Sequence, residues 1–72
     1  MKYEIWVEGY RTWPDHAEAT LFGVGEGEDL NAAALDLASR NEVFRKNFDP
    51  DRMVWWGCRI FDNETDAREV FG

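Results

Sequence analysis

The chain has 72 residues, 15% of them aromatic, and a formal net charge of −7 at pH 7. This length allows a single small domain over residues 1–72, with one core. The acidic balance disfavours direct binding of nucleic acid or of an anionic membrane surface, because both carry negative charge. It favours a basic protein as the partner.

The negative charge is concentrated in the first half of the chain. Residues 1–39 hold eight acids and two bases, a net charge of −6, whereas residues 40–72 hold seven acids and six bases, a net charge of −1. We therefore expect the surface that meets a basic partner to come mainly from the first half.

The cysteine content and the lengths of the apolar runs indicate the compartment in which we expect the protein. Cys58 is the only cysteine, so an intramolecular disulfide is excluded, which favours a reducing compartment. The first residues lack the basic start and the continuous apolar core of a signal peptide. No apolar run approaches the roughly 20 residues that span a bilayer. We expect a monomeric, cytoplasmic protein of a bacterial host, with no membrane partner.

Residues 2–9 alternate between apolar and polar side chains, which predicts a half-buried strand. The face that carries Glu4 and Glu8 also carries Trp6. This tryptophan could contact a partner, or it could be packed by neighbours within the chain. The inward face is Tyr3, Ile5 and Val7, and the outward face is Lys2, Glu4, Trp6 and Glu8.

A second strand is expected over residues 17–24, paired with the first as an antiparallel hairpin. Gly, Pro and Asp punctuate residues 9–16, which are expected to be a connection. From this connection Trp13 could fold back over the sheet. The inward face of the second strand is Ala19, Leu21 and Gly23, and the outward face is Glu18, Thr20 and Phe22.

A helix is expected over residues 30–40, with Glu28 or Asp29 at the position of the N-cap. An acid at this position also interacts favourably with the helix dipole. Three consecutive alanines, residues 32–34, indicate a close approach between this helix and the sheet. The inward stripe of the helix is Leu30, Ala33, Ala34, Leu37 and Ala38.

The last third of the chain predicts a short helix, a strand and a final helix. Asn41 can cap the short helix, residues 42–47. Residues 52–61 are apolar and β-prone, which predicts a central strand covered on both faces. Asp62 or Asn63 then caps the last helix, whose inward side is Ala67, Val70 and Phe71. The faces of the central strand are Val54, Trp56, Cys58 and Ile60 on one side, and Met53, Trp55, Gly57, Arg59 and Phe61 on the other.

This order of elements, β-β-α-(α)-β-α, predicts the α+β class. We expect a three-stranded antiparallel sheet with helices packed on it and an optional short helix before the third strand. The third strand must pair with the first or the second. The chain shows no internal repeat, linker or low-complexity stretch.

Three patterns are similar to chemical sites, and none is complete. Residues 23–27 lie between a strand and a helix but lack the spacing and the Lys-Ser/Thr pair of a phosphate loop, so a flexible turn is favoured. One histidine and one cysteine cannot complete a standard zinc site. The acids of residues 62–66 lack the glycine and the distal glutamate of a calcium loop. Cys58 is expected to be buried and inert, with a Cys58–His16 nucleophilic pair as the alternative. We expect no enzymatic activity, no metal and no cofactor.

The acidic surface is the remaining indication of function in the sequence. On the first strand Glu4 and Glu8 would stand about 13 Å apart on one face. Further acids could extend them into a negative band that imitates the phosphates of DNA, and ordinary acidic solubility is the alternative. The expected partner-binding residues are Glu4, Trp6, Glu8, Trp13, Glu18, Glu26, Glu28 and Asp29.

Both ends of the chain resemble small bacterial proteins carried by prophages and mobile elements. The similar segments are Met-Lys-Tyr-Glu-Ile-Trp-Val-Glu-Gly-Tyr at the start and Trp-Gly-Cys-Arg-Ile-Phe-Asp-Asn-Glu-Thr-Asp-Ala-Arg-Glu-Val-Phe-Gly at the close. In size, charge and lack of enzymatic motifs the chain is similar to DNA-mimicking anti-CRISPR proteins, a likeness of class. This resemblance implies an inhibitor that blocks a nucleic-acid-binding surface, with a Cas effector subunit as partner. The alternatives are a mobile-element accessory protein that binds through an aromatic patch, and a small thiol enzyme.

Overall fold

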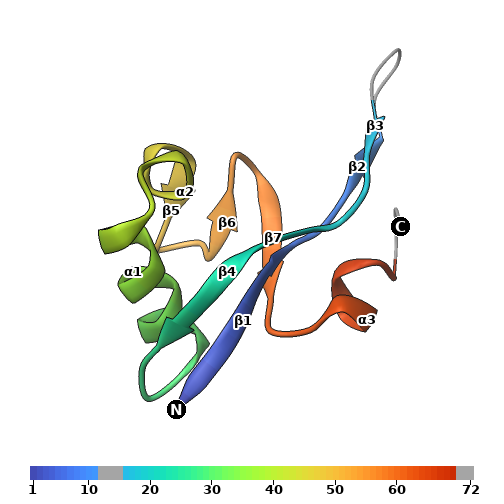
Figure 1. Ribbon diagram of the computed structural model, residues 1–72. Coiled ribbons are helices and arrows are strands. Elements are labelled where there is room, and N and C mark those ends of the chain that lie inside the picture. The colour runs from blue at the N-terminus through green and yellow to red at the C-terminus, as the bar shows by residue number, and fades with distance from the viewer. Residues whose placement is uncertain (12–15, 70–72) are drawn as a thin grey trace.

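The computed structural model describes residues 1–11 and 16–69, and these form an α+β fold (Figure 1). Within these residues the larger sheet has five strands in the order β4-β1-β7-β6-β5, all neighbours antiparallel, and β2 and β3 form a separate pair. The predicted α+β class is confirmed, and the predicted three-stranded sheet is wrong. The strands are β1 (Lys2–Val7), β2 (Tyr10–Arg11), β3 (His16–Ala17), β4 (Thr20–Glu26), β5 (Phe48–Asp49), β6 (Val54–Trp55) and β7 (Cys58–Phe61), and the helices are α1 (Leu30–Arg40), α2 (Glu42–Asn47) and α3 (Glu64–Ala67).

Residues 52–61 form a hairpin and not the predicted single strand. A two-residue turn, Trp56-Gly57, joins β6 to β7, with φ angles of 50° and 82°. Positive φ at both central residues is the geometry of a type I′ turn, which matches the twist of a two-stranded ribbon. Trp55 pairs with Cys58 across the hairpin, and both pack against the core, whereas Trp56 leaves the strand. The apolar run concealed the turn because a tryptophan stands where asparagine usually marks one.

The expected connection of residues 9–16 is partly a ribbon of two short strands. Residues 10–11 of β2 pair with residues 16–17 of β3. This ribbon extends the β1–β4 hairpin away from the rest of the molecule (Figure 1). As a result β4 begins at Thr20, later than predicted. Trp13 lies outside the described residues.

A register shift overturns the predicted sides of Leu21 and Phe22, while Gly23 faces Leu37 of α1, inward as predicted. Trp6 of β1 pairs with Leu21, whereas the preceding residue of β1 pairs with Gly23. Phe22 is thus an extra residue, and such a bulge reverses the alternation of side chains on its strand. Phe22 points to the core, with its ring centroid 5.3 Å from that of Phe44, while Leu21 is 45% exposed.

Helix α1 has the predicted bounds and packs closely on β4. Its N-cap is Asp29, whose carboxylate accepts a hydrogen bond from the Ala32 N–H at 2.8 Å. A Cβ at Gly25 would collide with the carbonyl of Ala33. The glycine repeat of residues 23–27 is therefore a contact surface for an alanine-rich helix. This confirms the predicted close approach and accounts for the repeat without a phosphate.

The core lies between the inner face of the sheet and the helices α1 and α2. Phe44 of α2 is fully buried, and its ring stacks on that of Phe48 with centroids 4.8 Å apart. As predicted, Asn41 ends α1 and caps α2, since its side chain accepts a hydrogen bond from the Phe44 N–H at 3.0 Å. The buried core cluster is Ile5, Val7, Ala33, Ala34, Leu37, Ala38, Phe44 and Ile60.

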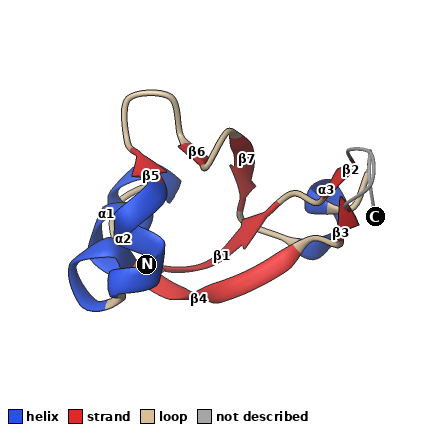
Figure 2. Cartoon of the chain, turned by 90° about the horizontal axis from the view of Figure 1, so that it is seen from above, coloured by secondary structure: helices blue, strands red, loops and turns tan. Residues whose placement is uncertain are grey.

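Helix α3 lies at the opposite end of the molecule from α1 and α2 (Figure 2). Its N-cap is Asn63, as predicted, whose side chain accepts a hydrogen bond from the Asp66 N–H at 2.7 Å. The helix contacts β1 and β7, and Ala67 is its buried residue. The further inward residues that the sequence predicts, Val70 and Phe71, lie outside the described residues.

Candidate protein-binding surface

Four of the predicted acids gather at one end of the β1–β4 hairpin. Glu26 pairs with Lys2, two residues before Glu4, so both carboxylates lie on the outward face of the hairpin. Glu28 and Asp29 follow in the turn that leads to α1. Among the described residues, none of these four carboxylates forms an ion pair. We call Glu4, Glu26, Glu28 and Asp29 the acidic end.

The edge of β4 beside the acidic end is covered by side chains of α1. Asp36 accepts a hydrogen bond from the Glu26 N–H at 2.9 Å, and Arg40 donates to the Val24 carbonyl at 2.9 Å and to Asp36 at 2.9 Å. The Glu26 amide, followed by Arg40, lowers the pKa of Asp36 from its ordinary value of 3.8. These side chains occupy polar groups that an edge strand would otherwise offer to another strand. A shallow depression of about 380 Å³ lies beside them.

Glu8, another predicted contact residue, is held within the fold. Its carboxylate accepts a hydrogen bond from the Arg59 N–H at 2.7 Å and lies 3.3 Å from the Arg59 guanidinium. Its own N–H donates to the Arg59 carbonyl at 2.9 Å. The Glu8 side chain is only 12% exposed. Glu8 therefore extends the pairing of β1 with β7 by one residue, and Arg59 balances its charge.

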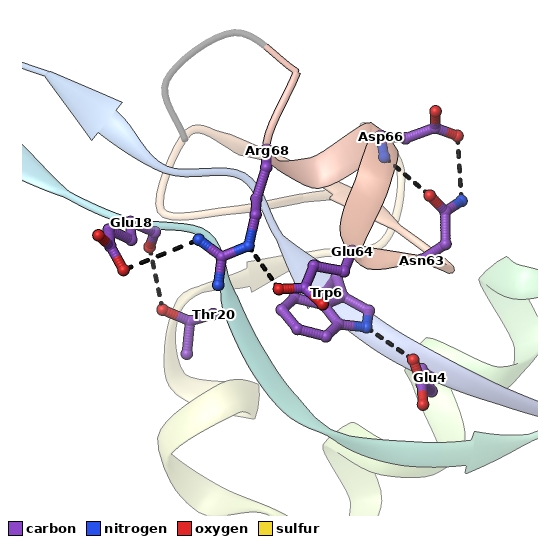
Figure 3. A network of polar contacts seen from close by, with 8 residues as sticks. All are labelled: Glu4, Trp6, Glu18, Thr20, Asn63, Glu64, Asp66 and Arg68. Atoms are coloured by element: carbon purple, nitrogen blue, oxygen red, sulfur yellow. Dashed lines mark hydrogen bonds and ion pairs between the residues drawn. The ribbon is translucent and has the colours of Figure 1, made fainter.

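Trp6 lies in a network of contacts within the chain (Figure 3). Its Nε1 donates a hydrogen bond to Glu4 at 2.8 Å, and the Arg68 guanidinium lies 6.0 Å from the centroid of its ring. Arg68 also forms ion pairs with Glu64 at 2.6 Å and with Glu18 at 3.7 Å. Sequence reasoning did not place Glu64 on this surface, because only the packing of α3 against β1 and β7 brings it there.

A hollow of about 240 Å³ opens between the β1–β4 hairpin and the β6–β7 hairpin. Two of its walls are the rings of Trp55 and Trp56, whose planes meet at 69° with centroids 6.3 Å apart. Trp56 is 69% exposed, which contradicts its predicted place on a covered strand face. Trp55 is half-buried, and its Nε1 is buried without a hydrogen-bond partner in the described part of the chain. We call this feature the aromatic hollow and define it by Glu8, Tyr10, Glu18, Phe22, Trp55 and Trp56.

Cys58 also lines the aromatic hollow and is half-buried. Burial raises the pKa of its thiol from the ordinary value of 9.0, and the negative charge of Glu8 raises it further. The thiol is therefore protonated at neutral pH, which makes it a weak nucleophile. The side chain of His16 lies outside the described part of the chain, so the Cys58–His16 pair stays a prediction.

Within residues 1–11 and 16–69, no three His, Cys, Asp or Glu side chains come together in a way that could hold a metal ion. Over those ranges no helix has the length and apolar character needed to cross a membrane.

Comparisons with protein-family models, with curated proteins and with solved structures found no match. The acidic end, the network around Trp6 and the aromatic hollow are therefore the basis for assigning a function.

Proposed function

We propose that this chain is a non-enzymatic inhibitor from a phage or mobile element. It binds the basic, nucleic-acid-binding surface of a host defence complex as an acidic DNA mimic, and a Cas effector subunit is the partner that the resemblance implies. The observation that carries the proposal is the acidic end. Its four acids come from β1, from the end of β4 and from the turn before α1, and among the described residues none of them is balanced by an ion pair. Two of the carboxylates also accept hydrogen bonds within the chain, Glu4 from the Trp6 Nε1–H and Asp29 from the Ala32 N–H.

Carboxylates can replace phosphates at a basic surface because the same side chains bind both. The guanidinium of arginine forms bidentate, charge-assisted hydrogen bonds with either group, and lysine offers a point charge to either. Unbalanced carboxylates also steer a positive partner during diffusion, which raises the association rate at low ionic strength. Glu18 and Glu8 do not add unbalanced charge in this way, because Arg68 lies 3.7 Å from Glu18 and Arg59 lies 3.3 Å from Glu8.

The proposal is tested by competition with DNA. A purified Cas effector is mixed with the chain before labelled target DNA is added, and DNA binding is followed by gel shift. We expect the chain to reduce DNA binding, and we expect this effect to weaken as salt screens the charges. In parallel, tagged protein is used to capture partners from a host lysate, and excess duplex DNA should release them. Capture that neither salt nor DNA alters would rule out mimicry.

A matched pair of variants separates the acidic end from overall charge. Neutralising three acids of that end should weaken binding by roughly ten-fold, if each lost contact is worth the usual few tenths of a kcal/mol to 1 kcal/mol. Neutralising three exposed acids elsewhere changes the net charge equally and should have little effect. Equal losses in both variants would show that only bulk charge matters. The first variant is Glu4→Gln, Glu26→Gln and Glu28→Gln, and the control is Glu42→Gln, Asp51→Asn and Glu69→Gln.

The aromatic hollow favours a second candidate, an accessory protein of a mobile element that binds its partner through aromatic contacts. The supporting observation is the 69% exposure of Trp56 beside the hollow. Aromatic residues dominate the energetics of many protein interfaces. For this candidate, Trp56→Ala would remove most of the affinity, and binding would depend only weakly on salt.

A further inference from the structure

Trp56 occupies a turn position that tryptophan rarely takes. It is the first central residue of the β6–β7 turn and has a φ of 50°, in the left-handed region that side chains other than Gly, Asn and Asp rarely adopt. The residue is 69% exposed, and its ring meets that of Trp55 edge to face. A large aromatic residue that breaks a local rule and stays mostly exposed points to a function for that residue.

This turn brings Trp56 into the lining of the aromatic hollow. The plane of the Trp56 ring is inclined at 69° to that of Trp55, so the two rings form a corner. Phe22 supports Trp55 from the core side, with ring centroids 4.8 Å apart. Glu8 and Glu18 also line the hollow, and each carboxylate has an arginine of the chain beside it, Arg59 at 3.3 Å and Arg68 at 3.7 Å. The Glu18 pair is a weak one, because the Glu18 side chain is 78% exposed to solvent. The hollow thus combines aromatic faces, which carry partial negative charge, with acids.

The volume of the hollow and its aromatic lining favour one kind of ligand. The roughly 240 Å³ of the hollow is smaller than the roughly 300–1,000 Å³ of pockets that hold drug-sized ligands, so a single side chain is the better fit. Aromatic faces at an angle attract cations. The guanidinium of arginine is planar, stacks on aromatic rings and is weakly hydrated, so it enters such a hollow more easily than the ammonium of lysine.

We propose that the aromatic hollow receives an arginine side chain from the basic partner, with the guanidinium against Trp55 and Trp56 and its charge facing Glu18. This deepens the proposed function and rests on it for the identity of the partner as a basic protein. The acidic end then supplies long-range attraction, and the hollow supplies a specific anchor.

The binding experiment needs no partner protein. Four blocked peptides of the form Gly-X-Gly, with X as arginine, lysine, citrulline or leucine, are titrated into the full chain to tens of millimolar. The indole N–H signals of the tryptophans are followed by two-dimensional NMR after assignment through Trp→Phe variants. The arginine peptide should shift the Trp55 and Trp56 signals and leave that of Trp6, which donates to Glu4, unchanged. Citrulline, the neutral analogue, should bind about two-fold to thirty-fold more weakly, the range of a cation–π contact.

Three results of this titration would overturn the proposal. The first is equal or tighter binding of the leucine or citrulline peptide, which would make the hollow an ordinary apolar pocket. The second is the absence of any shift at Trp55 and Trp56 with the arginine peptide. Tighter binding of lysine than of arginine would also contradict the choice of occupant.

Variants connect the binding to Trp56 and keep the two proposals apart. Trp56→Asn should abolish the arginine-specific shift, and it should fold, because Asn-Gly is the preferred sequence of this turn. Val43→Asn, which removes another exposed apolar side chain, should leave the shift unchanged. Unchanged arginine binding in Trp56→Asn would overturn the hollow as the site. The triple variant of the acidic end should bind the arginine peptide normally while losing affinity for the effector, so each proposal can fail without the other.

Discussion

Trp6 and Trp56 both lie near the surface, and their surroundings are opposite. Trp6 has its Nε1 bonded to Glu4 and its ring beneath the Arg68 guanidinium. Trp56 is 69% exposed at a turn with positive φ. The Trp6 side chain thus makes contacts within the chain, whereas most of Trp56 is open to solvent.

The difference shows that aromatic residues must be judged by their partners and not by their position in a sequence pattern. Alternation on β1 placed Trp6 on the outward face and left open whether a partner or the chain itself covers its ring. Arg68, directly after α3, lies over the ring. The apolar run of residues 53–61 placed Trp56 in the covered interior, yet a turn releases it. Availability of a ring for binding depends on contacts that form only in the folded chain.

The largest expected effect is the loss of stability in Trp6→Ala. This change removes a half-buried ring, a hydrogen bond and a cation–π contact, so the free energy of unfolding should fall by roughly 2–4 kcal/mol, near the cost of truncating a core aromatic residue. The measurement is urea denaturation followed by far-UV circular dichroism. The matched change, Trp56→Asn, should raise the free energy of unfolding by up to about 1 kcal/mol, because asparagine tolerates the positive φ that tryptophan does not. A marked loss of stability in Trp56→Asn would erase the contrast between the two sites.

The next effect concerns Glu8, which follows β1 and bonds to Arg59 of β7, between the surroundings of Trp6 and those of Trp56. Glu8→Ala removes the acceptor of the Arg59 N–H and the partner of the guanidinium, so we expect a loss of about 1–3 kcal/mol in the free energy of unfolding. Glu28→Ala is the control, since Glu28 is exposed and forms no ion pair within the described residues, and it should change stability by less than about 0.5 kcal/mol. Equal effects of the two changes would mean that the Glu8–Arg59 contact adds nothing beyond surface charge.

The helices could be predicted well from the sequence because their signals are local. Asp29 and Asn41 cap the helices that follow them, and each side chain acts within three residues of its own position. The inward stripe of α1 repeats at the helical period, so its buried face was found together with its bounds. The three alanines likewise indicated the close contact with β4 that the glycines make possible.

The sheet could be predicted less well because its features depend on long-range pairing and on single backbone angles. The bulge at Phe22 arises from the register between β1 and β4, and no local pattern marks it. The Trp56-Gly57 turn contains a glycine, but an aromatic residue at its first position conceals it. For the candidate site, the acids of the acidic end could be named from the sequence, and their role in binding stays a prediction. The balance of Glu8 by Arg59 could not be foreseen, because it depends on a contact between residues 51 positions apart.

The smallest effect concerns Cys58, and it links the two regions through charge. Its pKa is raised, so the folded state holds the thiol proton more tightly than the unfolded state does. The stability that this adds is present below the ordinary pKa of 9.0 and is lost as the pH rises through the higher folded value. Alkylation by iodoacetamide should therefore be slow at neutral pH and rise with a midpoint above 9.0 in the folded protein. In Glu8→Gln the midpoint should move down, because one source of the shift is gone, while burial keeps it raised. A midpoint at or below that of the urea-unfolded chain would show instead that Cys58 is an activated thiol, and the small thiol enzyme would then replace the inhibitor as the better assignment.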